Sequence, residues 1–305
     1  MPMGPAQWDG VAGKQVVLTG GTSGIGLAAA EALAAKGANV AIVARDSRRG
    51  EEAAGRARAA AATAGRHPTV EVLLADLSSQ AEVRRLAGEV ERRYPRVEVL
   101  VNNAGAIFSR RQLTGDGAER TWAVNHLAPF LLTVLLLDKL QGSAPARVVT
   151  TGSEAGRRCQ IPFDDLDGTQ AYASSWSPAP GFRRYGETKL ANIVFTMELA
   201  RRTQGTGLSA YCFHPGNVAT NFNRNNGAFM RFGMTVAKRF SRTPAEGAQT
   251  LVWLAESGAL DGKSGAYFCD MKEQDVPAGA NDLEVGRRLW EISETQVRVA
   301  ASQAP

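Results

Sequence analysis

The chain has 305 residues, of which 44% are hydrophobic and 21% charged, and this ordinary globular composition excludes a disordered or fibrous protein. The length suits one large α/β unit with a buried core, so we expect a single domain over residues 1–305. The formal net charge is +5, but Lys and Arg are spread along the chain, which argues against a nucleic-acid-binding surface.

Short apolar β-rich runs alternate with longer segments of helical period, a pattern typical of βα units around a parallel sheet. In chain order we expect strand 16–19, helix 27–36, strand 40–44, helix 51–64, strand 70–74, helix 81–93, strand 97–101, helix 119–140, strand 147–151, helix 185–202, strand 208–214, helix 244–256, strand 265–268 and helix 282–299. The predicted fold is α/β and Rossmann-like, with a doubly wound, mostly parallel β-sheet flanked by helices.

Two segments break this rhythm, and each follows the carboxyl end of a predicted strand. Segment 155–182 is rich in Pro, Trp and Tyr, and segment 221–241 is rich in Asn, Phe, Arg and Met. Ligands of open α/β sheets bind at that edge, so we expect both insertions to wall a substrate site. Their aromatic side chains favour a bulky, largely apolar substrate.

Cysteine usage and hydropathy indicate a cytoplasmic protein. The three cysteines, Cys159, Cys212 and Cys269, are too few and too widely spaced for a disulfide framework. No apolar run reaches the roughly 20 residues needed to cross a bilayer, and residues 1–14 do not resemble a signal peptide. We expect no membrane partner, and the sequence leaves monomer or homodimer open.

A glycine-rich turn joins the first predicted strand to the first helix. It reads Thr19-Gly20-Gly21-Thr22-Ser23-Gly24-Ile25-Gly26. Glycines in this position let the backbone approach a pyrophosphate, whose charge then lies against the N-terminus of the helix. A tight turn alone would demand similar residues, but the strand before it and the helix after it favour a dinucleotide site.

The second predicted strand ends at Ala44 and Arg45, where an NAD enzyme would normally carry an acid for the adenosine ribose. A guanidinium makes charge-assisted bonds to a 2′-phosphate, which favours NADP(H) over NAD(H). The other interpretation is a solvated surface arginine, and Asp46 next to it weakens the inference.

Tyr185 and Lys189 are four residues apart on a predicted helix, so their side chains share one face. An ammonium beside a phenol lowers the tyrosine pKa toward a range useful for acid–base chemistry near neutrality. Such a pair is by itself also typical of a solvated helix face.

Taken together, the motifs resemble the short-chain dehydrogenase/reductase family. Its elements recur in the family's order: residues 19–26, Asp76-Leu77, Asn102-Asn103-Ala104-Gly105, Asn125, Ser153, Tyr185 with Lys189, and Pro215-Gly216 followed by Thr220. Residues 125–130, 189–192, 214–216 and 288–291 are most similar to the retinol-dehydrogenase-like branch. Membrane-bound members of that branch carry an N-terminal anchor, which we do not find here, so only the chemistry is carried over.

The resemblance implies a role for each matched residue. Tyr185 would be the general acid/base, Ser153 would hold the substrate oxygen, Lys189 would bind the nicotinamide ribose and tune the phenol, and Asn125 would hold a water of a proton relay. The cofactor residues would be Gly20, Thr22, Ser23, Gly24, Ile25, Gly26, Arg45, Asp76, Leu77, Asn103, Ala104, Tyr185, Lys189, Pro215, Gly216, Val218 and Thr220. The expected activity is NADP(H)-dependent interconversion of a ketone or aldehyde and its alcohol.

Other interpretations remain. A catalytically silent NADP(H)-binding module would share the fold, but it would be expected to lose Tyr185 or Lys189. Epimerase and enoyl reductase relatives would show other glycine or Tyr–Lys spacings, and a scaffold protein would not need the ordered motifs. We expect no metal site, because His67, His126 and His214 lack ligand partners at metal-binding spacing. We expect the pairs Arg157-Arg158 and Arg183-Arg184 to be solvated at the surface, with an acidic substrate as their alternative partner.

Overall fold

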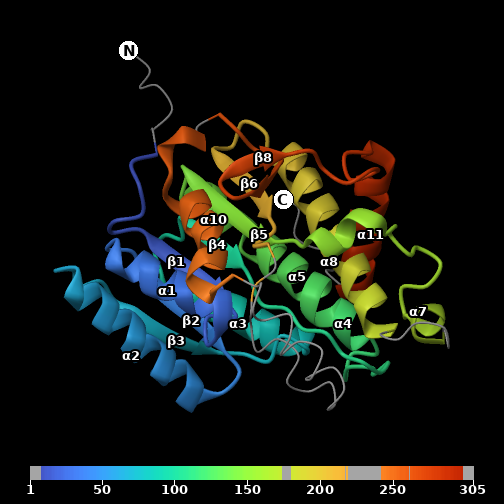
Figure 1. Cartoon of the computed structure of the whole chain (residues 1–305), viewed down its shortest axis with the longest axis horizontal. Coiled ribbons are helices and arrows are strands. Elements are labelled where there is room, and N and C mark those ends of the chain that lie inside the picture. Colours follow the sequence, from blue (N-terminus) through green and yellow to red (C-terminus); the bar gives the residue numbers. More distant parts are fainter. Residues whose placement is uncertain (1–7, 174–179, 217, 219–241, 261, 298–305) are drawn as a thin grey trace.

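A single twisted sheet forms the centre of the molecule (Figure 1). The computed structural model describes residues 8–173, 180–216, 218, 242–260 and 262–297. Its eight-stranded sheet has the order β3-β2-β1-β4-β5-β6-β7-β8, and every neighbouring pair is parallel except β7 with β8. The strands are β1 Gln15–Thr19, β2 Asn39–Ala44, β3 Val70–Leu74, β4 Val99–Asn102, β5 Ala146–Thr151, β6 Leu208–Phe213, β7 Ala266–Cys269 and β8 Lys272–Gln274.

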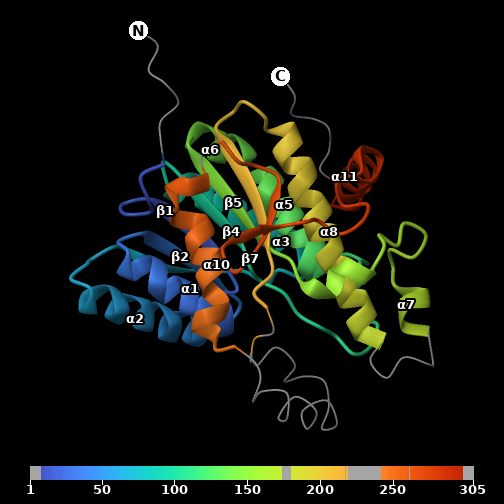
Figure 2. The same ribbon diagram turned by 45° about the horizontal axis from the view of Figure 1, so that its top comes forward.

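Helices cover both faces of the sheet, as Figures 1 and 2 show. One layer contains α1 Gly24–Ala35, α2 Ser47–Thr63 and α10 Pro244–Glu256. The other contains α3 Gln80–Arg93, α5 Ala128–Leu135, α8 Pro180–Arg202 and α11 Leu283–Val297. Each layer packs on its own cluster of buried apolar side chains. Because both faces are covered, the inner strands are nearly continuous apolar runs, and the predicted doubly wound fold is confirmed.

The expected long helix 119–140 is wrong as one element. The structure divides it into α4 Arg120–Trp122, a π-helical turn at Ala123–Leu127, α5, and α6 Leu137–Gly142. Pro129 has no backbone N–H, so it cannot bond the carbonyl of Asn125 as a regular helix would require. The backbone N–H of Ala128 instead donates to the Ala123 carbonyl five residues earlier. Such π-turns are frequent at functional sites.

Several boundaries also differ from the predictions. Helix α1 begins at Gly24, inside the glycine turn, and α8 begins at Pro180, so Tyr185 lies within the helix instead of at its start. The short elements that were not predicted are α7 Thr169–Ala173, the edge strand β8, and 3₁₀ turns at Glu154–Arg158 and Gly258–Leu260. The β7–β8 turn uses Asp270 and Met271 with positive φ in place of glycine, and therefore carries no strong sequence signal.

Within the described ranges, no helix combines the length and the apolar character needed to cross a membrane. The expected helix 282–299 corresponds to α11, and the part beyond residue 297 lies outside the description.

Candidate functional site

The predicted site residues gather along one edge of the sheet, because they follow the carboxyl ends of parallel strands. Gly20 follows β1, Arg45 follows β2, Asp76 comes shortly after β3, Asn103 follows β4 and Ser153 follows β5. The strand order reverses between β1 and β4, and open α/β sheets bind ligands outside such a reversal. The fold therefore brings to one edge residues that are as much as 133 positions apart in the sequence, from Gly20 to Ser153.

The glycine turn is packed directly against the end of β4. Gly20 has a φ of +71°, and a side chain there would press on the backbone of Ala104. A Cβ on Gly26 would collide with the Gly20 carbonyl and with the side-chain amide of Asn103. Only glycine therefore allows β1, α1 and the β4 loop to meet this closely.

Asn103 supports this turn with its side chain. Its Nδ2 donates to the carbonyls of Thr19, at 3.0 Å, and Gly20, at 3.3 Å. The backbone amides of Asn103 and Ala104 both donate to the Thr19 hydroxyl, at 3.0 and 3.1 Å. The resemblance implied a ribose contact for Asn103, and the structure adds that its amide nitrogen is already committed to the turn.

The first helix begins without a side-chain cap, unlike its neighbours. Ser23 is the N-cap residue of α1, yet its side chain accepts no bond from the helix, and the first turn contains no acidic residue. By contrast, Asp46, Ser79 and Thr243 cap α2, α3 and α10 with their side chains. The N-terminus of α1, with its N–H groups and positive dipole end, therefore lies in the glycine-rich turn at Thr22 to Gly24. This arrangement fits the pyrophosphate of a dinucleotide.

Arg45 is exposed at the end of β2, while its neighbour Asp46 is occupied. Asp46 caps α2 by accepting a bond of 2.8 Å from the backbone N–H of Arg49. In the sequence, Asp46 weakened the inference that Arg45 binds a phosphate, because its carboxylate would repel that group. The capping bond instead gives this carboxylate a structural role. The charge of Arg45 contributes to lowering the pKa of the Asp76 carboxyl group.

Asp76 is held in its charged form. Burial alone would raise the pKa of this carboxyl group, but bonds from Ser78 and the charges of Arg45 and Arg120 lower it below its usual value. Its Oδ1 accepts from the Ser78 backbone N–H at 2.9 Å and from the Ser78 hydroxyl at 2.8 Å. These bonds fix the loop between β3 and α3 that carries Leu77.

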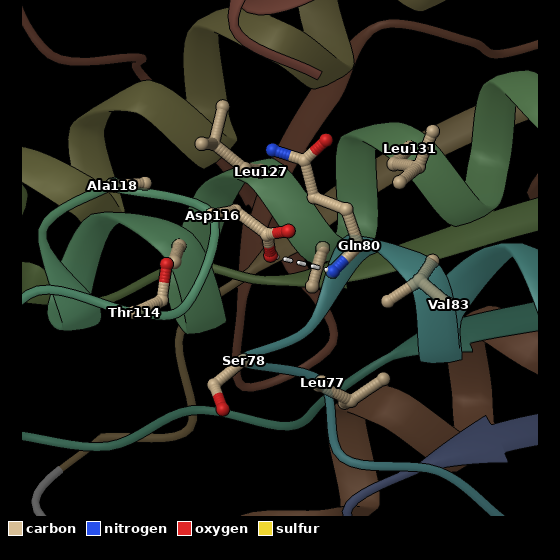
Figure 3. Close-up of a pocket in the computed structure, with 11 residues that line it drawn as sticks. Leu77, Ser78, Gln80, Val83, Thr114, Asp116, Ala118, Leu127 and Leu131 are labelled. Atoms are coloured by element: carbon tan, nitrogen blue, oxygen red, sulfur yellow. Dashed lines mark hydrogen bonds between the residues drawn. The ribbon is translucent and has the colours of Figure 1, made fainter. Parts of the chain in front are cut away.

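Leu77 and Ala104 line the same small pocket beside α5. Leu77 also forms part of an adjoining pocket between the start of α3, the loop before α4, and α5 (Figure 3). There Asp116 accepts a bond of 2.9 Å from the backbone N–H of Gln80, which ties the loop to α3. The structure thus brings together two residues that the resemblance assigned to cofactor contacts.

Val218 lies beside Ile25, where both approach α10. A Cβ on Gly247 would touch the side chains of both residues, so this helix glycine makes room for them. Pro215 and Gly216 follow β6, and Gly216 has a φ of +74° with its backbone N–H donating to Nδ1 of His214 at 3.2 Å. Thr220 and the insertion 221–241 lie outside the described residues.

Tyr185 and Ser153 meet across the gap between α8 and the end of β5. Their side chains are hydrogen-bonded, and the bond lowers the pKa of the phenol, but burial has the larger effect and raises that pKa to about 12. Ser153 also accepts from the backbone N–H of Ala155 at 3.2 Å. The expected lowering of the tyrosine pKa is therefore not found, because burial outweighs it, and the phenol is protonated near neutral pH.

Lys189 is buried beneath Tyr185. Its Nζ lies 5.6 Å from the centre of the Tyr185 ring and donates to the carbonyl of Thr151 at 2.8 Å. Burial lowers the pKa of this ammonium to about 8. The shared helix face predicted from the sequence brings the two side chains together, but in the core of the site instead of in solvent.

Asn125 sits in the π-helical turn and is fully buried. Its Oδ1 accepts from the backbone N–H of Ala106 at 2.8 Å, and its Nδ2 donates to the Ala106 carbonyl at 2.9 Å and to Thr188 Oγ1 at 3.1 Å. The side chain therefore ties the loop after β4 to the helix that carries Tyr185 and Lys189.

Sequence reasoning missed the partners of two residues near the site. His214 was expected to have no metal-binding role, and the structure places its Nε2 3.5 Å from the carboxylate of Glu154, the residue that follows Ser153 in the sequence. Arg184 was expected at the surface or facing an acidic substrate, but its side chain is completely buried and bonded to Glu119 and Glu187. No local signal distinguishes Arg184 from the exposed Arg183, because both lie in the same polar stretch. Among the residues described, no cluster of His, Cys, Asp or Glu has the arrangement of a metal site.

Comparison with known proteins supports this arrangement. Residues 14–231 match the family described as short chain dehydrogenase. Human (Homo sapiens) retinol dehydrogenase 14 is 42% identical over 298 residues, an alignment that covers 93% of this chain and 86% of that protein.

Solved structures agree with the fold. A crystal structure of an uncharacterized protein from Mycobacterium paratuberculosis has 30% identity and a TM-score of 0.70, covering 97% of this chain and 98% of the other. A short chain dehydrogenase from Burkholderia cenocepacia J2315 in complex with NADP has 25% identity and a TM-score of 0.66, covering 90% and 100%.

Proposed function

The chain belongs to the short-chain dehydrogenase family, and on this premise we propose that it uses NADP(H) to reduce a bulky, largely apolar ketone or aldehyde to the alcohol, and to reverse that reaction. The observation that carries the proposal is the contact of the Tyr185 phenol with the Ser153 hydroxyl, together with the buried Lys189 ammonium 5.6 Å from the centre of the Tyr185 ring. A structural helix face would not need a half-buried phenol in contact with both a serine hydroxyl and a buried ammonium.

Each side chain has a defined task in the proposed reaction. The bound cofactor supplies or accepts the hydride. The Ser153 hydroxyl donates a hydrogen bond to the substrate oxygen, and Tyr185, protonated at neutral pH, gives its proton to that oxygen. Lys189 holds positive charge beside the phenol and stabilises the phenolate that remains. Asn125 fixes the loop after β4 against α8 and so maintains their separation.

Support for NADP(H) comes from the end of β2. Arg45 is exposed there with no acid at Ala44, and Asp46 is occupied by the α2 cap. A guanidinium in this place suits a 2′-phosphate. The related protein from Burkholderia cenocepacia was itself crystallised with NADP.

The test is turnover of NADPH with a series of cyclic and aromatic ketones and aldehydes by the parent and Tyr185→Phe. Loss of the transferable proton should lower kcat by about 10²–10⁴-fold with little change in the Kd for NADPH. Tyr94→Phe is the matched control. Tyr94 donates to Glu71 at 2.7 Å near the start of β3, away from the carboxyl edge of the sheet, so this variant should keep full turnover. Turnover by Tyr185→Phe within tenfold of the parent would contradict the assignment.

A further inference from the structure

Arg184 is a fully buried guanidinium next to the proposed general acid. Its Nε donates to Glu119 at 2.9 Å and its Nη1 to Glu187 at 3.2 Å. Nη1 also contacts the carbonyl of Asp165 at 3.4 Å, and Nη2 donates to the carbonyl of Leu166. The group therefore uses all three of its nitrogens, which suits a buried charge that must be both paired and hydrogen-bonded.

Glu119 is the second centre of this buried cluster, and it is also completely buried. Besides Arg184, its carboxylate caps α4 by accepting from the backbone N–H groups of Thr121, at 2.8 Å, and Trp122, at 2.9 Å. The hydroxyl of Tyr172, on α7, lies within hydrogen-bonding distance of the same carboxylate, at 3.2 Å, and of the carbonyl of Phe108, at 3.0 Å. One carboxylate thus joins the start of α4 to the insertion.

The insertion 155–182 is tied to the cluster at several points in its described part. Asp165 gives its backbone carbonyl to Arg184 and caps α7 with its side chain, accepting from Gln170 at 2.9 Å and Ala171 at 2.8 Å. Figure 2 shows α7 beside the first turns of α8. The guanidinium therefore holds the start of α7 against α8.

The cluster also connects the two helical segments that carry the proposed catalytic side chains. Arg184 immediately precedes Tyr185 on α8. Glu119 caps α4, which leads directly into the π-helical turn that holds Asn125. A change in the length of the Arg184–Glu119 bridge would therefore move these two segments relative to each other.

We propose that Arg184 and Glu119 are positioning residues, which set the separation of Tyr185 from Asn125 and hold segment 160–173 as a fixed wall for bulky carbonyl substrates. This inference rests on the proposed function of the same site. Its physical basis is that a planar guanidinium has several donors in fixed directions, whereas lysine presents a compact ammonium. A misplacement of about 1 Å at a catalytic group costs as much as about 100-fold in rate.

The neighbouring arginine provides a matched control. Arg183 also bonds Glu187, at 3.0 Å, but 61% of its side chain is exposed. Arg183→Met removes the same chemical group from the same helix turn without touching Glu119, Asp165 or Leu166. We expect this variant to retain the parent's kinetics, because exposed ion pairs contribute little.

Two variants test Arg184 itself. Arg184→Lys keeps the charge and loses the fixed directions of the bonds. The double variant Arg184→Met/Glu119→Gln removes both charges and leaves Glu187 paired with Arg183; replacing a buried pair by uncharged groups of similar size often preserves stability. The double variant therefore keeps the test valid if Arg184→Lys fails to fold.

The first measurement does not require activity. Amide hydrogen exchange of Thr121, Trp122, Gln170 and Ala171, whose N–H groups bond Glu119 or Asp165, should be faster in both Arg184 variants than in the parent and Arg183→Met. Exchange rates equal to those of Arg183→Met would overturn the inference, even if the parent showed no carbonyl turnover and the proposed function failed.

The second measurement separates positioning from general stability. With NADPH binding intact, the kcat of folded Arg184 variants should fall by about 10–100-fold, and the preference for 2-decalone over cyclohexanone should decrease as the wall loosens. Arg184→Lys should recover part of the kcat lost in the double variant. Faster exchange with unchanged kcat and an unchanged ratio of the two ketones would show a merely structural cluster and reject the inference.

Discussion

The two sides of the proposed site are held by different kinds of interaction. On the cofactor side, the glycine turn is kept in place by close backbone contact and by hydrogen bonds between uncharged groups, which Asn103 donates to Thr19. On the catalytic side, α8 is connected to α4 and the insertion by the buried charges of Arg184 and Glu119. The difference fits the proposed ligands: a turn that is to receive phosphate must leave its N–H groups open, whereas a phenol that is to transfer a proton must be oriented by groups around it.

The strongest way to break the cofactor side is to add a methyl group to the turn. In Gly26→Ala, the new Cβ meets the Gly20 carbonyl and the Asn103 amide, so we expect a loss of about 1–3 kcal/mol in stability together with much weaker NADPH binding. Urea unfolding and fluorescence titration measure the two effects. Gly55→Ala is the control, since Gly55 is in α2 with no atom within 4 Å of a new Cβ, and it should be neutral or stabilising. NADPH binding by Gly26→Ala at parental affinity would show that the close packing is dispensable.

A second change exchanges the charge at the edge of the cofactor side. Arg45 is expected to favour NADPH over NADH by about tenfold to a hundredfold, because a charge-assisted contact is worth roughly 1.5–3 kcal/mol. In Ala44→Asp/Arg45→Ile the preference should invert, since the acid accepts from a ribose hydroxyl and repels a phosphate. The ratio of kcat/KM for the two cofactors, at one ketone concentration and one ionic strength, checks this. A parent enzyme that prefers NADH would contradict the role of Arg45 and leave the reaction class untouched.

On the catalytic side, the burial of Lys189 predicts a stability that depends on pH. Its pKa is about 8 in the folded protein, against 10.5 for the free side chain, so the unfolded chain binds more protons between these values and stability rises with pH. The rise should be at most about 1.4 kcal/mol per pH unit for one group. It should be absent in Lys189→Met when urea unfolding without cofactor is compared at pH 8, 9 and 10. Parallel curves for parent and variant would show that Lys189 does not titrate in this range.

The smallest expected effect concerns the uncapped start of α1. Ser23→Asp should stabilise the cofactor-free protein by about 0.3–1 kcal/mol, because a carboxylate interacts well with a helix N-terminus. The same charge would repel a pyrophosphate, so the Kd for NADPH should increase. The melting temperature without cofactor and the Kd for NADPH should therefore both increase, because the same charge stabilises the helix and weakens binding. A tighter complex with NADPH would place the phosphates elsewhere.

Much of the architecture follows from local sequence signals. The alternation of apolar runs and helical segments predicts the βα order, and β3 and α10 have the expected bounds. The glycine turn and the Tyr185–Lys189 pair are also readable, because their function depends on short spacings. The break of the long helix has a partial signal in Pro129, but the side-chain bonds of Asn125 to Ala106 and Thr188 join segments far apart in the chain.

The sequence by itself thus determined the order of the elements, the glycine-rich turn between β1 and α1, and the identity of the proposed acid, since each depends on neighbours within a few residues. Only the tertiary structure decided that Arg184 is buried while Arg183 is exposed, that Asn103 supports the turn, and that the phenol of Tyr185 has a raised pKa. Burial and charge pairing depend on which distant segments pack together. Two adjacent arginines on one helix consequently have opposite environments that no local pattern distinguishes.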